Sequence, residues 1–289
     1  MAQSIREDVK FASQGELCAG WLYRPQGSGT SSSEKQPAIV LGHGLGAVKE
    51  MKLDAYASVF SAAGYVCLCF DYRHFGESTG RPRQLLDISK QLEDWQSALD
   101  YISSLEFVDN AKIGIFGSSF GGGHVITTPA KDKRVKAVIS QCPFTVGLAS
   151  AATLGLLPLL RVGFLAIRDI LFSRGDSIVP VKLGGNPGET ALMNAPDVHL
   201  YKQLVPEGHE IKDYVAARIG LHIGMYNPEW QAKDVDVPIF FAICGKDSVA
   251  PPGPTLRFAK QAPKATVRHY PDMGHFDIYL GENFDKVTA

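Results

Sequence analysis

Gly117-Ser118-Ser119-Phe120-Gly121 follows an apolar run at 113–116 and precedes a segment with the pattern of a short helix. A serine flanked by glycines at this spacing, between a strand and a helix, is typical of a nucleophile held in a tight turn. The glycines relieve the crowding of such a turn, and the helix N-terminus favours developing negative charge. The stretch therefore predicts that Ser119 is a catalytic nucleophile, with an incidental serine in a glycine-rich turn as the alternative.

A serine nucleophile needs a base and a carboxylate that orients it, and candidates for both follow Ser119 in the chain. Asp247 comes three residues after the strand-like run 237–244, and His275 comes shortly after the run 266–270. The carboxyl ends of parallel strands meet at one edge of a sheet, so we expect these two side chains to lie beside the serine. The sequence thus predicts His275 as general base and Asp247 as its orienting acid.

An acyl-transfer reaction also needs amide N–H groups around the developing oxyanion. Phe120 follows the predicted nucleophile directly and supplies one N–H. The segment His43-Gly44-Leu45-Gly46 follows the short apolar strand 38–41, and its glycines would let the Leu45 N–H turn toward the same point. Leu45 and Phe120 are therefore the expected oxyanion donors.

The loop at 42–47 also permits a different hypothesis. Gly42-His43-Gly44-Leu45-Gly46-Ala47 matches the G-x-G-x-x-A fingerprint of dinucleotide-binding proteins, and Asp71 ends the next strand, where a ribose-binding acid would lie. Such a fingerprint usually follows the first strand of the sheet, whereas here a hairpin precedes it. A nucleotide-dependent oxidoreductase would also leave the predicted catalytic residues without a role, so it is the weaker alternative.

Strand and helix patterns alternate through most of the chain, which predicts an α/β fold with a mostly parallel central sheet flanked by helices. The alternation covers residues 1–143 and resumes over residues 231–289. Residues 144–230 interrupt it with a leucine-rich helix and a second helix expected around 211–219. We interpret this interruption as a helical cap inserted into the core.

Composition and charge exclude several classes of protein. With 29 basic and 30 acidic residues and a net charge of -1, the chain lacks the basic surface of a nucleic-acid-binding protein. Its five cysteines form no CxxC pair, so buried free thiols are expected, with no metal site or disulfide and no bound cofactor. The uncharged stretch 144–160 is about 17 residues long, contains Gly147, Gly155 and Pro158 and is too short for stable membrane insertion, and the charged N-terminus predicts a cytoplasmic location.

The motifs together resemble the α/β-hydrolase superfamily, over nearly the whole chain outside the cap. They are H-G-x-G at 43–46, the segment 71–78, G-x-S-x-G at 117–121, Cys-Gly-Lys-Asp at 244–247, and G-H-F at 274–276. The opening hairpin and the cap are similar to those of hydrolases, thioesterases and acyl transferases associated with fungal polyketide biosynthesis. The resemblance implies a triad of Ser119, Asp247 and His275, with Leu45 and Phe120 as oxyanion donors and 71–78 as a structural segment beside the site.

The cap suggests the kind of substrate. Its leucine-rich helix carries too many apolar residues for one helical face, so some should pack on the core or on a second subunit, giving a possible homodimer, and others should line an acyl pocket. The sharper prediction is a trans-acting thioesterase that releases a polyketide chain, which an acyl carrier protein would present, by hydrolysis or lactonisation. A general carboxylesterase is the alternative.

Overall fold

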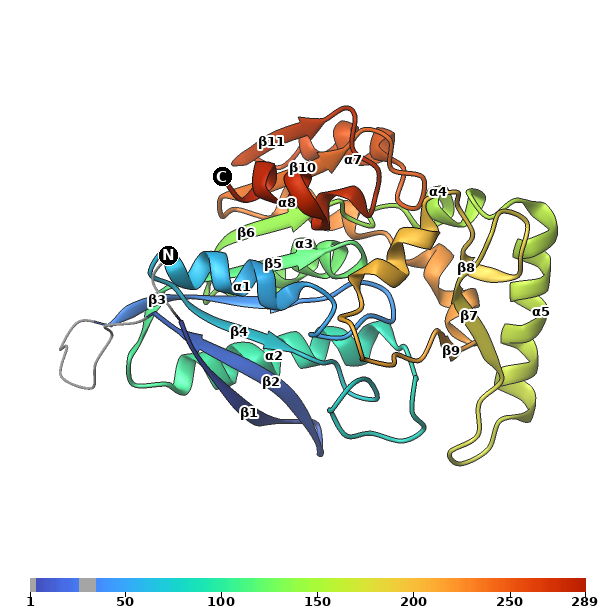
Figure 1. The fold of residues 1–289 in the computed structure, drawn as a ribbon, viewed down its shortest axis with the longest axis horizontal. Coiled ribbons are helices and arrows are strands. Elements are labelled where there is room, and N and C mark those ends of the chain that lie inside the picture. The colour runs from blue at the N-terminus through green and yellow to red at the C-terminus, as the bar shows by residue number, and fades with distance from the viewer. Residues whose placement is uncertain (1–3, 26–34) are drawn as a thin grey trace.

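The computed structural model describes residues 4–25 and 35–289. Its central sheet has eight strands in the order β1-β2-β4-β3-β5-β6-β10-β11 (Figure 1). Only β2 runs against the other strands: β1 pairs antiparallel with β2 and β2 antiparallel with β4, while all other neighbours are parallel. The strands are β1 (Ile5–Ser13), β2 (Glu16–Arg24), β3 (Gln36–Gly42), β4 (Val66–Phe70), β5 (Val108–Ser118), β6 (Val135–Gln141), β10 (Ile239–Cys244) and β11 (Ala265–Tyr270).

Helices cover both faces of this sheet, as the alternating pattern predicted. In Figure 1, α1 and α8 lie in front of the strands and α2 and α3 behind them, and Tyr56 of α1 contacts Phe284 of α8 with ring centroids 4.9 Å apart. Because both faces are covered, β4 is buried along its entire length. The helices of the core are α1 (Leu53–Ala62), α2 (Ile88–Ser104), α3 (Phe120–Lys131), α7 (Pro252–Ala259) and α8 (Gly281–Thr288).

The segment between β6 and β10, which we call the cap (residues 144–230), stands at the carboxyl end of the parallel strands (Figure 1). Its leucine-rich helix is α5 (Leu156–Phe172), and α4 (Gly147–Ala152), α6 (Ile219–His222) and the 3-10 helices η1 (Val198–Leu204) and η2 (Ile223–Met225) are shorter. A further 3-10 helix, η3 (Pro228–Asp234), leads back to the core.

The cap is not purely helical, and the helix expected around 211–219 was wrong. It contains a three-stranded sheet in the order β8-β7-β9, made of β7 (Pro180–Gly184), β8 (Ala191–Met193) and β9 (Tyr214–Ala216). Val215, at the centre of the expected helix, pairs with Val181 in antiparallel register. A short apolar run fits a strand or a helix equally well by periodicity, and here β7 supplies the hydrogen-bonding partner that decides for the strand.

None of the helices within the described residues combines the length and the apolar character needed to cross a membrane.

Candidate active site

Ser119 occupies a strained turn between β5 and α3, as the motif predicted. Its φ and ψ are 57° and -118°, a conformation that costs a non-glycine residue on the order of 1–3 kcal/mol. Hydrogen bonds hold it there: its N–H donates to the Gln141 carbonyl at 2.9 Å and its carbonyl accepts from the Phe144 N–H at 2.9 Å. At Gly121 a Cβ atom would lie 2.5 Å from the His43 carbonyl oxygen, so close packing under the turn requires glycine.

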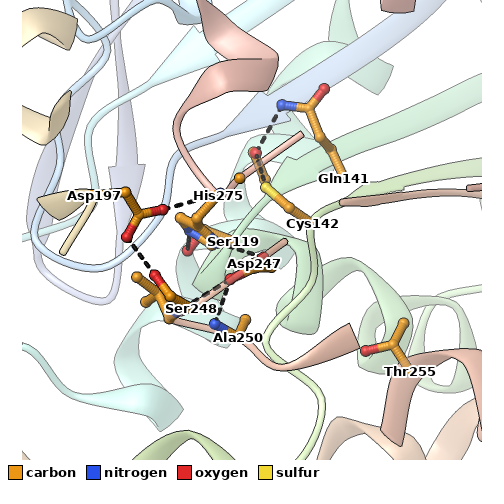
Figure 2. Close-up of polar contacts among 12 residues, drawn as sticks. Ser119, Gln141, Cys142, Asp197, Asp247, Ser248, Ala250, Thr255 and His275 are labelled. Atoms are coloured by element: carbon orange, nitrogen blue, oxygen red, sulfur yellow. Dashed lines mark hydrogen bonds and ion pairs between the residues drawn. The ribbon is translucent and has the colours of Figure 1, made fainter. Parts of the chain in front are cut away.

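The structure brings the three predicted residues into one chain of hydrogen bonds (Figure 2). His275 Nε2 lies 2.9 Å from Ser119 Oγ, and His275 Nδ1 lies 2.7 Å from Asp247 Oδ2. The other carboxylate oxygen of Asp247 accepts the N–H groups of Val249 at 2.9 Å and Ala250 at 2.7 Å, which fixes the carboxylate. The arrangement can transfer a proton from the serine hydroxyl to an imidazole whose far side faces a carboxylate.

Ser118, the neighbouring serine, takes no part in this chain. Its hydroxyl lies within hydrogen-bonding distance of the Tyr279 hydroxyl and accepts from Gln141 Nε2 at 2.9 Å, and the side chain is buried. Ser119 is therefore the serine that faces His275.

The electrostatics of His275 are dominated by negative charge. Burial disfavours the imidazolium, but Asp247, the Cys142 sulfur and Asp197 outweigh burial and raise the pKa of His275 from 6.5 to about 9. The imidazole therefore becomes an efficient proton acceptor only as the pH rises toward that value.

The two predicted oxyanion donors lie beside the serine. Leu45, Ser119 and Phe120 line one cavity. Within the part of the chain that the structure describes, neither the Leu45 N–H nor the Phe120 N–H donates to a backbone or side-chain acceptor. Two unpaired amides beside a nucleophile are what stabilisation of a tetrahedral oxyanion needs.

A cluster of ion pairs around Lys49 fixes the loop that carries Leu45. The sequence did not predict this cluster. The fully buried Lys49 ammonium lies 3.0 Å from Asp71, 2.8 Å from Glu50 and 2.6 Å from Glu77. Among the described residues, these three carboxylates lie close enough together to share a metal ion. The Lys49 ammonium already lies among them and supplies the positive charge. Asp71 further accepts the Lys49 N–H at 2.7 Å, so it has the structural role that the resemblance implied.

This arrangement also argues against the dinucleotide hypothesis. Asp71 is fully buried and its carboxylate is occupied by Lys49, so it cannot reach a ribose. The glycine-rich loop packs against the nucleophile instead: a Cβ at Gly44 would lie 2.9 Å from Ser119 Cβ. The loop therefore packs on the turn that carries Ser119, and the acid that would bind a ribose is unavailable.

An apolar cavity opens above Ser119, between the core and the cap. Phe144, Leu154, Val162, Leu192 and Met193 are among its walls, so the cap supplies most of the lining. The free volume of the cavity is about 30 Å³. That space holds a few water molecules at most.

Asp197, in the cap, is a site residue that sequence reasoning missed. Its carboxylate accepts the Ser248 hydroxyl and, at 3.3 Å, the backbone N–H of His275 (Figure 2). No motif marks it, because the cap sequence outside the core follows none of the patterns that located the other residues. It lies directly before η1, whose Tyr201 hydroxyl donates to the Leu45 carbonyl at 3.4 Å.

Comparison with known proteins agrees with this geometry. Residues 33–278 match the family model described as serine aminopeptidase, S33. The quorum-quenching protein AidA of Acinetobacter baumannii is 47% identical over 283 residues, which cover 97% of this chain and 91% of that protein. The thiohydrolase aneE of Aspergillus aculeatus is 28% identical, over 97% of this chain and 89% of that protein.

The solved structures give the same result for the fold. The structure of DcsB in complex with its substrate analogue has a TM-score of 0.81 and 25% identity, and covers 98% of this chain and 96% of that chain. The resemblance to the α/β-hydrolases is thereby confirmed, and the relatives include fungal proteins named as a thiohydrolase and, in Penicillium crustosum, as the polyketide transferase claH. Because the family model spans most of its length, this chain belongs to the S33 serine aminopeptidase family of the α/β-hydrolases.

Proposed function

We propose that this protein is a serine acyl hydrolase that opens the ester bond of a lactone or ester bearing an apolar acyl group. The observation that carries the proposal is the contact chain Ser119–His275–Asp247 placed at the floor of an apolar cavity beside two unpaired amides. Relatedness to a quorum-quenching protein at 47% identity supports a small signalling ester as the substrate class.

The reaction follows from the geometry. Ser119 Oγ attacks the carbonyl carbon while His275 Nε2 takes its proton, and the oxyanion accepts the Leu45 and Phe120 N–H groups. Collapse of the intermediate expels the alcohol, which receives the proton from His275 and leaves an acyl-serine. Water then attacks and loses a proton to His275, and His275 returns this proton to Ser119 Oγ as the bond to the acyl group breaks and the acid departs.

For a lactone, the expelled alcohol remains attached to the acyl-serine. Release of a chain by lactonisation passes through this same intermediate in the opposite direction, with the tethered hydroxyl as the nucleophile and a thiol as the earlier leaving group. Thioester cleavage is therefore the second candidate function, favoured by the relatedness to a thiohydrolase over nearly the full length. Where water reaches the acyl-serine, the product is the acid. Where water is excluded and the tethered hydroxyl attacks, the product is the lactone.

The test compares three substrates made from the same hydroxyacyl chain: its lactone, its open-chain ester and its thioester. We expect the highest kcat/KM on the lactone or ester, a single fluorophosphonate adduct on Ser119 by intact mass, and a loss of about 10³-fold or more in Ser119→Ala. A higher kcat/KM on the thioester would select the second candidate. Equal rates for wild type and Ser119→Ala would refute both.

A further inference from the structure

The outer face of α5 is strongly apolar and uncovered. The helix packs on the cap through Pro158, Val162, Ala166 and Asp169, and Arg218 fixes Asp169 with a 2.6 Å ion pair. Figure 1 shows α5 at the outer edge of the cap, beyond β7 and β8 from the central sheet. Nine large apolar side chains of α5 remain exposed: Leu156, Leu157, Leu159, Leu160, Phe164, Ile167, Ile170, Leu171 and Phe172.

These side chains form one continuous face. At about 100° per residue, all of them except Phe172 fall on one half of the helix, with Arg161 and Arg168 at its edge. With about 100 Å² exposed per side chain, the eight side chains on this face make a patch on the order of 800 Å², whereas the largest apolar patch of a monomer is usually about 300–600 Å². Gly163 lies within this face with open space above it, which allows a second helix to approach closely.

We propose that this face is the interface between two copies of the chain, packed α5 against α5 about a twofold axis. Two such faces would bury at most about 1,600 Å² in total, within the range of about 1,200–2,000 Å² of stable interfaces. A lipid surface fits less well: interfacial helices carry a polar face rich in Lys and Arg, whereas α5 has only Arg161 and Arg168 at the edge of this face, its other charged residue, Asp169, is buried against the cap, and the net charge of the chain is -1. Since Leu159 and Val162 also line the cavity, a partner helix would support the cavity wall.

Light scattering after size-exclusion chromatography tests the interface. We expect twice the mass of one chain for the wild type at micromolar concentration and the mass of one chain for the double variant Leu160→Glu, Phe164→Glu, which should still unfold cooperatively because both side chains are exposed. Val267→Glu, which alters an exposed apolar residue on β11, is the matched control and stays dimeric. A monomeric wild type, a dimeric double variant, or flotation of the wild type with anionic phospholipid vesicles would overturn the proposal.

A second inference rests on separate contacts and on the proposed function. Asp197 joins the cap to both loops that carry the orienting acid and the base, through the Ser248 hydroxyl and the His275 N–H. Four residues further on, the ring of Tyr201 packs on Phe276 with centroids 5.8 Å apart. The start of η1 thus contacts the loops around Asp247, His275 and Leu45 at once.

We infer that Asp197 is a positioning residue that aligns His275 when the cap is closed. Its carboxylate approaches the His275 backbone and does not reach the bond-forming atoms, so it acts through the base. Its charge reinforces those of Asp247 and the Cys142 sulfur, which also face the imidazole. Removal of the cap contact would therefore loosen the base and lower its proton affinity together.

The variants Asp197→Asn and Asp197→Ala separate charge from contact. Asparagine keeps an acceptor but loses the charge, so the pH midpoint of kcat/KM should fall with little change in Tm. Asp197→Ala should also lower kcat by about 10- to 100-fold, with a smaller effect on KM. Asp197→Glu, which restores a carboxylate, should have a higher kcat than Asp197→Ala. Asp213→Ala is the control, because Asp213 is a cap carboxylate that accepts the Gly184 N–H at 3.1 Å.

An unchanged kcat and pH midpoint in Asp197→Ala would overturn this inference, as would equal effects of Asp213→Ala. Fluorophosphonate labelling of wild-type Ser119 reports on the proposed function alone. A failure of the proposed function would abolish labelling and turnover in the wild type, whereas a failure of the inference leaves the wild type active.

Discussion

Replacement of Asp247 by asparagine should remove most of the activity and leave the fold intact. Oδ1 of Asp247 accepts two backbone N–H groups, at 2.9 and 2.7 Å, and an asparagine oxygen can keep these contacts. The amide NH₂ must then face His275 Nδ1, which lies 2.7 Å from the present oxygen. Because the NH₂ donates, the imidazole proton is forced onto Nε2, the atom that should accept the proton of Ser119.

This wrong tautomer reduced kcat by about 10⁴-fold in a serine protease with the same constellation, and a similar loss is expected here. It corresponds to about 5 kcal/mol in activation free energy. Initial rates on the ester panel and the Tm would be measured for Asp247→Asn and for the control Asp272→Asn, whose side chain is 89% exposed in the loop before His275. Retention of more than about a tenth of the wild-type kcat in Asp247→Asn would refute the assigned role.

Three further outcomes are expected. Gly121→Ala should lower the free energy of unfolding in urea by about 1–3 kcal/mol, because its Cβ would meet the His43 carbonyl oxygen, and an unchanged midpoint would contradict the tight turn. Lys49→Met should cost about 3–5 kcal/mol by leaving the buried Asp71 without its counter-charge, measurable as a large fall in Tm. Since neutral His275 is the base and its pKa is raised, kcat/KM should increase with pH up to about 9, and a profile already flat at neutral pH would count against this.

The core of the fold and the candidate triad could be predicted from sequence because both depend on local patterns. The glycines around Ser119 are needed wherever a strand turns sharply into a helix, and the strand pattern itself places Asp247 and His275 at the same edge of the sheet. The order of residues along the chain then supplies the constellation without any knowledge of distances.

The cap resisted prediction for the opposite reason. Whether the run around Val215 forms a strand depends on β7, more than thirty residues earlier, and no local signal records that pairing. Asp197 likewise gains its role from contacts with Ser248 and His275 across long stretches of chain. Tertiary context, which a periodicity cannot encode, decided both.

The cavity above Ser119 holds a few water molecules at most, which is too little space for an acyl substrate. An acyl chain of several carbons needs more space than this, so we expect the cap residues that line the cavity, among them Leu159 and Met193, to move outward when such a chain binds. The length of the acyl chain that is accepted would then depend on how far the cap can move away from the core, and not on the size of a preformed pocket. If this motion limits the rate, the reaction of bulky esters should slow as the solvent viscosity rises. The reaction of a reagent small enough to fit the existing cavity should not depend on viscosity.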